Sequence, residues 1–286
     1  MKAPSTASPF FAWLTLTRPW NVLAIGAMVM IIQRWMGFPM AEWATPGAAG
    51  WIAVPMLVGA AGNLINDYFD VREDRINKPD RALVGRQVKR RVVLVSHWGL
   101  SLAAWVWSAW LSVTIGSHWP LTLSTAFTVI LYFYSPVLKG RGAWGNLAIS
   151  LCVGGLVLWG GLASMFTNPV VGPFDWVAFG LVLAGMNFLR EWVKDLQDVE
   201  GDRNAGHRTL AAILTPKQTQ WGLSIGLVIM VIAGGWWACQ HVPLGVKWGP
   251  WLGAAMGCAA KTYLQNFKSL SAWLKALMGT WFIFLV

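Results

Sequence analysis

Long apolar stretches separated by short polar connections recur along the whole chain. Each stretch holds about 20 residues, which is the length that an α-helix needs to cross the hydrocarbon core of a membrane. The pattern predicts an all-α, polytopic membrane protein that forms a single domain over residues 1–286. The nine predicted transmembrane helices span residues 20–36, 51–69, 92–115, 119–134, 144–166, 173–192, 218–239, 244–263 and 271–286.

The composition supports the membrane interpretation. Hydrophobic residues make up 56% of the 286 residues and charged residues only 12%, whereas soluble domains carry about 25% charged residues. A soluble core of this size could not bury so much apolar surface, so a disordered chain, a secreted disulfide scaffold and a nucleic-acid-binding domain are excluded. The three cysteines have no metal-ligand spacing and are expected to be small packing residues.

The basic residues are distributed unevenly among the predicted connections. The net charge is +10, and 20 of the 22 Lys and Arg residues fall in the N-terminal segment or in every second connection; Arg34 and Lys247 are the exceptions. The positive-inside rule therefore predicts that the N-terminus and these connections face the cytoplasm. We expect an integral, multi-pass protein of an inner or plasma membrane that contacts membrane lipids and no nucleic acid.

The acidic residues are concentrated in two matching clusters. Ten of the 12 Asp and Glu residues lie within residues 67–80 and 191–202. Each cluster has the form D-x-x-D-V-x-x-D-R, and matching residues are 128 positions apart, as Asp67 and Asp195 are. We therefore expect two four-helix repeats, at about residues 10–140 and 141–265, plus a ninth helix at 271–286. Repeats in membrane proteins commonly form a shared site at their interface.

Helical periodicity gathers three carboxylates of each cluster on one face of a predicted helix. The positions are Asp67, Asp70 and Asp74 in the first cluster and Asp195, Asp198 and Asp202 in the second. Glu191 joins the second face one turn earlier, whereas Glu73 and Glu200 are expected to point away. Such carboxylates repel one another at low dielectric unless a cation lies between them. Mg²⁺ suits this role because it binds through a few carboxylates together with substrate phosphates.

A structural interpretation of the acids is the alternative. They could form solvated ion pairs with basic residues of the same connections: Arg72, Lys78, Lys194 and Arg203. The matched repetition of the clusters favours the metal site.

Both clusters resemble motifs of a known family. The segment N-D-Y-F-D-V-R-E-D-R-I-N-K-P-D-R, from Asn66 to Arg81, resembles the first aspartate motif of the UbiA family of intramembrane prenyltransferases. The segment R-E-W-V-K-D-L-Q-D-V-E-G-D, from Arg190 to Asp202, resembles the second. The R-P-W-N segment at Arg18 resembles the opening of the family sequence. Residues 134–139, followed by Gly145-Asn146, are similar to the connection between the fourth and fifth helices.

This resemblance implies a nine-helix fold around a central cavity and a prenyltransferase activity. A polyprenyl diphosphate would bind there through two Mg²⁺ ions, its diphosphate would leave, and a lipid or small-molecule acceptor would capture the allylic cation. The expected metal ligands are Asp67, Asp70, Asp74, Asp195, Asp198 and Asp202, with Asn66 in support. The candidate diphosphate contacts are Arg75, Lys78, Arg81, Lys139, Lys194 and Arg203. Supporting roles are expected for Arg18, Asn21, Tyr134, Asn187 and Glu191.

Two further expectations concern neighbouring residues. Glu191 could assist the second metal site or pair with Lys194, and pairing with Lys194 is favoured. His97, His118, His207 and His241 show no zinc-binding pattern and are expected to lie outside the chemistry.

The acceptor is the least specified part of the resemblance. The D-R-I-N-K-P and R-E-x-x-K-D segments look most like family members that join a geranylgeranyl group to geranylgeranylglyceryl phosphate in phospholipid biosynthesis. Many relatives continue with R-P-x-P-S-G, but this chain has R-A-L-V-G from Arg81. An aromatic quinone precursor or a chlorophyllide-type acceptor therefore stays open.

A transporter of Mg²⁺ or of an anionic lipid is the alternative of another class. The position of both acidic faces at helix ends, and not at mid-membrane, weighs against it. A CDP-alcohol phosphotransferase would need a D-G-x-x-A-R segment before its aspartates, which neither cluster has.

Overall fold

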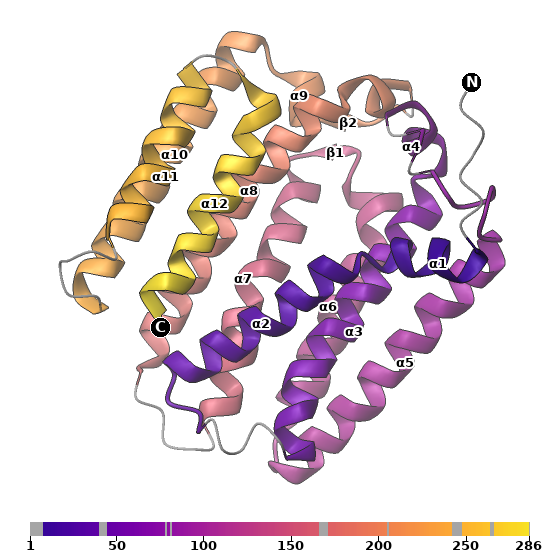
Figure 1. Ribbon diagram of the computed structural model, residues 1–286, viewed down its shortest axis with the longest axis vertical. Helices are drawn as coiled ribbons and strands as arrows, with labels where there is room; N and C mark the ends of the chain where they lie inside the picture. Colours follow the sequence, from indigo (N-terminus) through magenta and orange to yellow (C-terminus); the bar gives the residue numbers. More distant parts are fainter. Residues whose placement is uncertain are drawn as a thin grey trace.

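The computed structural model describes residues 8–39, 45–77, 79–80, 82–165, 171–204, 206–241, 248–263 and 266–285. Helices dominate these residues (Figure 1). The long ones are α2 (Pro19–Trp35), α3 (Pro46–Phe69), α5 (Arg90–Thr114), α6 (Trp119–Phe133), α7 (Trp144–Met165), α8 (Pro173–Asn204), α10 (Pro216–His241), α11 (Trp248–Tyr263) and α12 (Phe267–Leu285). The short elements are α1 (Pro9–Thr17), α4 (Val71–Asn77), the π-helix η2 (Tyr134–Leu138), α9 (Leu210–Ile213), β1 (Arg141–Gly142) and β2 (Arg208–Thr209).

A long helix overlaps each of the nine predicted ranges. Within the described residues, six helical segments are long and apolar enough to cross a membrane. They lie at Pro9–Trp35, Gly47–Phe69, Arg90–Thr114, Trp119–Leu138, Trp144–Ala163 and Pro216–His241. The helical, polytopic character expected from the sequence is therefore confirmed, while the count of nine membrane spans stays a prediction.

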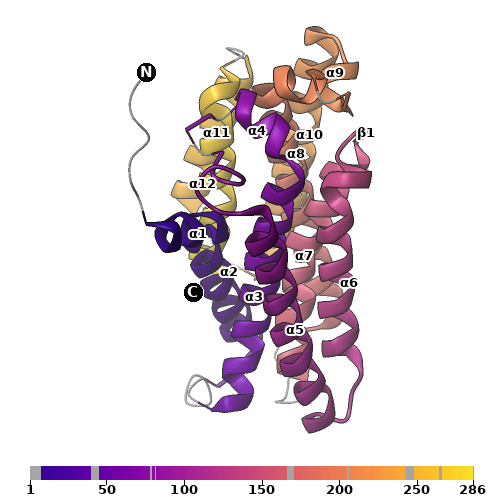
Figure 2. The ribbon, with the colours of Figure 1, turned by 90° about the vertical axis from the view of Figure 1, so that its right-hand side faces the viewer.

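The long helices stand side by side, and the short elements other than α1 gather at one end of the bundle. Figures 1 and 2 both show α4, α9 and β1 at this end. Strands β1 and β2 form a parallel pair that joins the connection after η2 to the connection after α8. Two segments that are far apart in sequence are thus held together beside the carboxyl-terminal ends of α3 and α8.

The break between α1 and α2 has a local cause. Arg18 adopts left-handed backbone angles (φ 55°, ψ 64°) between the two helices, a conformation that is uncommon for residues other than glycine. Pro19 follows, and a proline disfavours the helical conformation of the residue before it. The helical path therefore turns at Arg18, which places this side chain at a junction and not within a regular helical face.

Glycines allow α7 and α8 to approach closely, as expected of small residues in membrane helices. A Cβ atom on Gly154 of α7 would meet the backbone carbonyl of Gly180 in α8, and one on Gly161 would meet the ring of Trp176. The largest buried cluster surrounds this contact and includes residues of α2, α7, α8, α10, α11 and α12. Helix α8 is thus a central element of the bundle, with its last turns emerging among the short elements.

Candidate active site

The first acidic cluster lies where α3 ends. The helix stops at Phe69, Asp70 has non-helical backbone angles (φ −82°, ψ 17°), and α4 begins at Val71. Both Asp67 and Asp70 are buried. Arg18 Nη2 donates to Asp67 Oδ1 at 2.6 Å, and Asn66 Nδ2 donates to Asp70 Oδ2 at 3.1 Å.

The second acidic cluster lies on an uninterrupted helix. Helix α8 continues to Asn204, so that Asp195, Asp198 and Asp202 keep the spacing of one helical face. Asp195 and Asp202 are buried, whereas Asp198 is half-buried. Asn146, in the first turn of α7, donates from Nδ2 to Asp195 Oδ2 at 2.9 Å.

One lysine connects the two clusters. Lys139 follows η2, and its Nζ lies 2.7 Å from Asp70 Oδ2 and 3.6 Å from Asp202 Oδ1. Burial acts to lower the pKa of Lys139, but the carboxylates of Asp70 and Asp202 outweigh it and raise the pKa above the ordinary lysine value. The ammonium group stays protonated and occupies the position of a cation shared by carboxylates of both motifs.

The contacts of the two clusters repeat along the chain like the sequence. Arg18 contacts Asp67, and Asn146 contacts Asp195. The positions differ by 128 in both cases, since 146 − 18 and 195 − 67 are both 128. Each half therefore supplies a donor from an equivalent position to an equivalent aspartate, although one donor is a cation and the other is a neutral amide.

The predicted orientation of Glu73 is wrong. It was expected to point away from the acids, but it is buried with 8% of its surface exposed, and its Oε1 lies 3.7 Å from His207 Nε2. His207 Nδ1 in turn lies 3.9 Å from Asp202 Oδ1. The prediction of Glu73 assumed one continuous helix from residue 67 to residue 74, whereas the break at Asp70 turns the later residues. Glu200, on the unbroken α8, is exposed as expected.

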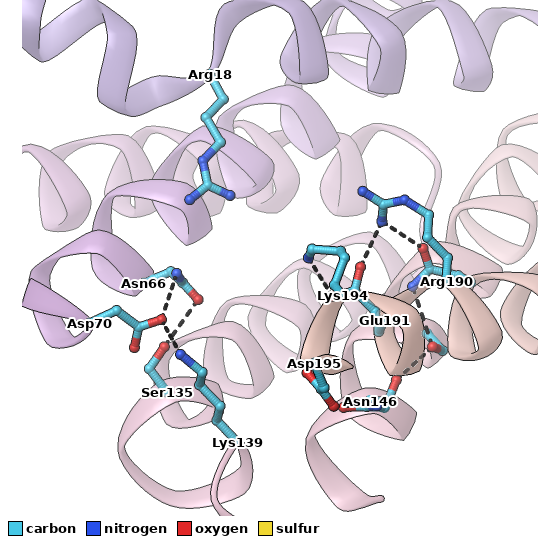
Figure 3. A network of polar contacts seen from close by, with 12 residues as sticks. Arg18, Asn66, Asp70, Ser135, Lys139, Asn146, Arg190, Glu191, Lys194 and Asp195 are labelled. Carbon is cyan, nitrogen blue, oxygen red and sulfur yellow. Dashed lines mark hydrogen bonds and ion pairs between the residues drawn. The ribbon is translucent and has the colours of Figure 1, made fainter. Parts of the chain in front are cut away.

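A second polar network runs along α7 and α8 (Figure 3). The expected pair is present, because Lys194 Nζ donates to Glu191 Oε2 at 2.6 Å. Arg190 Nη1 donates to Glu191 Oε1, also at 2.6 Å. Arg190 Nη1 further contacts Asn187 Oδ1 at 3.4 Å, and the Asn187 amide donates to Ser150 Oγ at 3.3 Å. Glu191 therefore pairs with two cations, and Asn187 connects one of them, Arg190, to Ser150 of α7.

The remaining candidate residues differ in how close they lie to the acidic clusters. Asp74 lines a small pocket together with Asp67. The Tyr134 side chain lies within electrostatic range of four carboxylates, those of Asp70, Glu191, Asp195 and Asp202. Asn21, Arg75 and Arg203 are exposed, and the Arg75 guanidinium lies beside Gly85. Lys78 and Arg81 lie outside the described residues.

Asn77 joins the two motifs through backbone groups. Its Nδ2 donates to the Asp198 carbonyl at 3.0 Å, and its Oδ1 accepts from the Gly201 amide at 3.0 Å. A Cβ atom on Gly201 would collide with the Asn77 side chain. The close approach of α4 to α8 thus requires glycine at position 201, and the pair of bonds fixes the end of the first motif against the second.

The carboxylate and amide oxygens of the two motifs suit a magnesium ion, although in this structure they contact other side chains of the protein. Within the described residues, no three His, Cys, Asp or Glu side chains lie close enough to hold one ion together. Both carboxylate oxygens of Asp202 are nevertheless buried without a hydrogen-bond partner, and a buried carboxylate of this kind requires positive charge. Carboxylate and amide oxygens are hard ligands that suit Mg²⁺.

Comparison with known proteins accounts for this arrangement of two aspartate motifs on a helical membrane scaffold. Residues 22–285 match the UbiA prenyltransferase family. The chain belongs to this family. It is a prenyltransferase by membership, and the expectation drawn from its motifs is confirmed.

One related sequence and two solved structures illustrate the similarity to individual proteins. A digeranylgeranylglyceryl phosphate synthase of Halobacterium salinarum is 33% identical over 243 residues, covering 81% of this chain and 82% of the relative. A solved structure of a digeranylgeranylglyceryl phosphate synthase superposes with a TM-score of 0.70 at 23% identity, covering 97% of both chains. A UbiA homologue from Archaeoglobus fulgidus bound to GPP and Mg²⁺ gives a TM-score of 0.59 at 14% identity, covering 94% of this chain and 99% of that one.

Several residues at the site were absent from the sequence-based candidates. His207 lies between Glu73 and Asp202, Ser135 donates to Asn66 Oδ1 at 3.1 Å, and Asn77 joins the motifs. The 128-residue offset could have identified Asn146, because it is the counterpart of Arg18. No signal in the sequence brings His207 to the site, since its position depends on the pairing of β1 with β2.

We predict that Glu73→Gln destabilises the protein more than Glu200→Gln does. The first change removes a buried charge beside His207 and Lys139, whereas the second alters an exposed side chain. A loss of about 1 kcal/mol or more is expected for the buried partner, which corresponds to about 2–4 °C in a chain of this size. Thermal unfolding in detergent measures both variants. Equal melting temperatures for wild type and Glu73→Gln would show that Glu73 is not part of the network.

Proposed function

We propose that this protein transfers a geranylgeranyl group from its diphosphate to geranylgeranylglyceryl phosphate. Family membership supports prenyl transfer, and the relatives named digeranylgeranylglyceryl phosphate synthase support this acceptor. The observation that carries the proposal is Lys139, which contacts Asp70 of the first motif and Asp202 of the second. Acids from both motifs therefore share one buried space, in which an anionic substrate needs cations.

The metal-binding roles follow from the buried carboxylates. We assign Asp67, Asp70, Asp74, Asp195, Asp198 and Asp202, with Asn66 in support, to two Mg²⁺ ions. When bound, Mg²⁺ neutralises negative charge on the leaving diphosphate. The A. fulgidus homologue is a family member with GPP and Mg²⁺ bound, which supports this use of the motifs.

The chain's own residues act on the diphosphate and on the reacting carbon. Lys139 can donate charge-assisted hydrogen bonds to a diphosphate oxygen, with Arg75, Arg203, Lys78 and Arg81 as further candidates. The C–O bond to the diphosphate breaks, the acceptor hydroxyl oxygen forms a new C–O bond, and the hydroxyl proton is released. The apolar helices exclude water, which would otherwise capture the allylic cation.

The proposed topology has nine membrane spans and a cytoplasmic site. The charge distribution supports it, since 20 of the 22 Lys and Arg residues lie on one predicted side. The internal repeat, with halves at about residues 10–140 and 141–265 and a ninth helix at 271–286, is supported by the matched contacts of Arg18 and Asn146.

Turnover should depend on both motifs and on a divalent metal. Asp67→Asn and Asp195→Asn preserve side-chain shape but remove one charge from each cluster. Each is expected to lower turnover by about 100-fold or more, because each removes several kcal/mol of electrostatic stabilisation from the leaving group. Glu200→Gln is the matched control and should retain activity. Purified protein is incubated with Mg²⁺, geranylgeranyl diphosphate and a panel of acceptors, and the products are identified by mass.

The same assay discriminates the alternatives. Product from an aromatic or chlorophyllide-type acceptor, with none from the glyceryl phosphate lipid, would replace the proposed acceptor. Full activity of either Asn variant would contradict a site shared by both motifs.

Topology can be tested with two single cysteines in a variant that lacks the natural ones. Lys217→Cys lies at the start of α10, beside the gathered short elements, and His118→Cys lies between α5 and α6. A membrane-impermeant maleimide applied to right-side-out vesicles should label position 118, and position 217 only after permeabilisation. Labelling of both positions from outside would refute the proposed orientation.

A further inference from the structure

Glu191 is the centre of a second charged group beside the aspartate clusters. It is buried with 5% of its surface exposed, and each of its carboxylate oxygens is already used by a different cation. Arg190 Nη1 donates to Oε1, and Lys194 Nζ donates to Oε2, both at 2.6 Å (Figure 3). One carboxylate is therefore shared by two cations.

Helix α12 adds a third cation to this group. It packs against α8, and Lys275 lies within electrostatic range of Arg190, Lys194 and Glu191. Asp195, one turn further along α8, also interacts with Lys194, but it accepts a hydrogen bond from Asn146 and belongs to the proposed metal site. Arg190, Lys194 and Lys275, here called the basic group, thus have Glu191 as their own counter-ion and carry excess positive charge.

The basic group retains hydrogen-bond donors that the protein does not use. Among the described residues, Arg190 Nε is buried and has no hydrogen-bond partner. A guanidinium carries five N–H donors and an ammonium three, whereas Arg190 Nη1 donates to Glu191 and Asn187, and Lys194 Nζ donates to Glu191. Lys194 is partly exposed and Lys275 is exposed, so that the ammonium groups of both lysines can reach a ligand. Excess positive charge with unused donors suits a phosphate monoester.

The position of the basic group matches the second substrate of the proposed reaction. Glu191 precedes Asp195 by one turn, a rise of about 6 Å along α8. In a glyceryl phosphate lipid, the hydroxyl that is alkylated and the phosphate belong to the same three-carbon unit. An acceptor whose phosphate lay on the basic group would therefore hold its hydroxyl next to the aspartate clusters, where the allylic carbon is released.

We propose that Arg190, Lys194 and Lys275 form the binding site for the phosphate monoester of the acceptor lipid, separate from the diphosphate site at Lys139 and the aspartates. This inference rests on the proposed function and names the acceptor subsite within it. Lys194, first considered for the diphosphate, is assigned to the acceptor because its ammonium contacts Glu191. The two anionic substrates are distinguished by their partners, metal ions for the diphosphate and the basic group for the monoester.

Lys275 provides the sharpest test because it lies outside both aspartate motifs. Lys275→Gln removes its charge, Lys275→Arg keeps it, and Lys217→Gln removes an exposed charge from α10 as the matched control. The full-length variants are placed in nanodiscs of zwitterionic lipid. KM is measured for geranylgeranylglyceryl phosphate and for geranylgeranyl diphosphate. Binding of the glyceryl phosphate lipid is measured separately by thermal shift, without Mg²⁺ or donor, and compared with that of the same lipid lacking its phosphate.

Lys275→Gln is expected to raise the acceptor KM about 10-fold and to leave the donor KM within about twofold of wild type. Lys275→Arg and Lys217→Gln should behave like wild type, and the lipid without phosphate should bind equally to all variants. An equal rise in the donor KM would assign Lys275 to the diphosphate and overturn the inference. In a parallel measurement with nanodiscs of anionic phospholipid, wild-type protein that no longer responds to the glyceryl phosphate lipid would identify a site for membrane headgroups and overturn it as well.

The outcomes also separate this inference from the proposed function. If wild type makes product from the glyceryl phosphate acceptor and Lys275→Gln has the same acceptor KM, the function stands and the acceptor subsite is wrong. If wild type makes no such product but binds the phosphorylated lipid through Lys275, the phosphate site stands and the proposed acceptor reaction is wrong.

Discussion

Carboxylates from two distant parts of the chain share a buried space, and their mutual repulsion is the constraint around which the site is built. Two unit charges 4 Å apart interact by about 4 kcal/mol at the effective dielectric of a protein site, so several acids cannot converge without cations. The protein supplies some of this charge itself: Lys139 contacts Asp70 and Asp202, and Arg18 contacts Asp67. The buried oxygens of Asp202, which lack hydrogen-bond donors, indicate that internal compensation is incomplete.

The surrounding architecture brings these charges together from both motifs. The break at Asp70 lets the first motif turn toward α8, and Asn77 then bonds to backbone groups of the second motif. The π-helix η2 leads directly to Lys139, and the β1–β2 pair holds His207 near Asp202. These elements are short. The long helices around them provide the apolar enclosure and the close α7–α8 contact.

The proposed division of charge would let one site accept two anionic substrates. The acidic side requires cations before a diphosphate can approach, whereas the basic group around Glu191 already carries excess positive charge. Glu191 and Asp195 lie on successive turns of α8, so in the proposed reaction one continuous helix would set the distance between the leaving group and the acceptor. Holding two reactants at a fixed separation is itself a substantial source of rate acceleration.

The sequence predicted the helices well because apolar length is a local property that the membrane makes decisive. It also identified the second acidic face, since α8 continues without interruption through Asp202. It failed for Glu73, because periodicity carries no information about the helix break at Asp70. It could not find Asn77, because its bonds to α8 join residues more than 100 positions apart. It could not find His207 either, because the position of this residue depends on the pairing of β1 with β2. Lys275 is one of the 20 basic residues that the sequence places on the predicted cytoplasmic side, while its neighbours on α8 became apparent only from helix packing.

Thermal unfolding of the detergent-solubilised protein tests the shared cation requirement most directly. Unfolding is followed with Mg²⁺ alone, with a non-hydrolysable prenyl diphosphate analogue alone, and with both together. The account predicts that the pair raises the melting temperature by more than the sum of the separate shifts, because each ligand supplies charge or oxygen atoms that the other needs. Glu200→Gln should keep this excess and Asp202→Asn should lose it. Strictly additive shifts, or none, at concentrations that support turnover would contradict a site in which both motifs hold metal and diphosphate together.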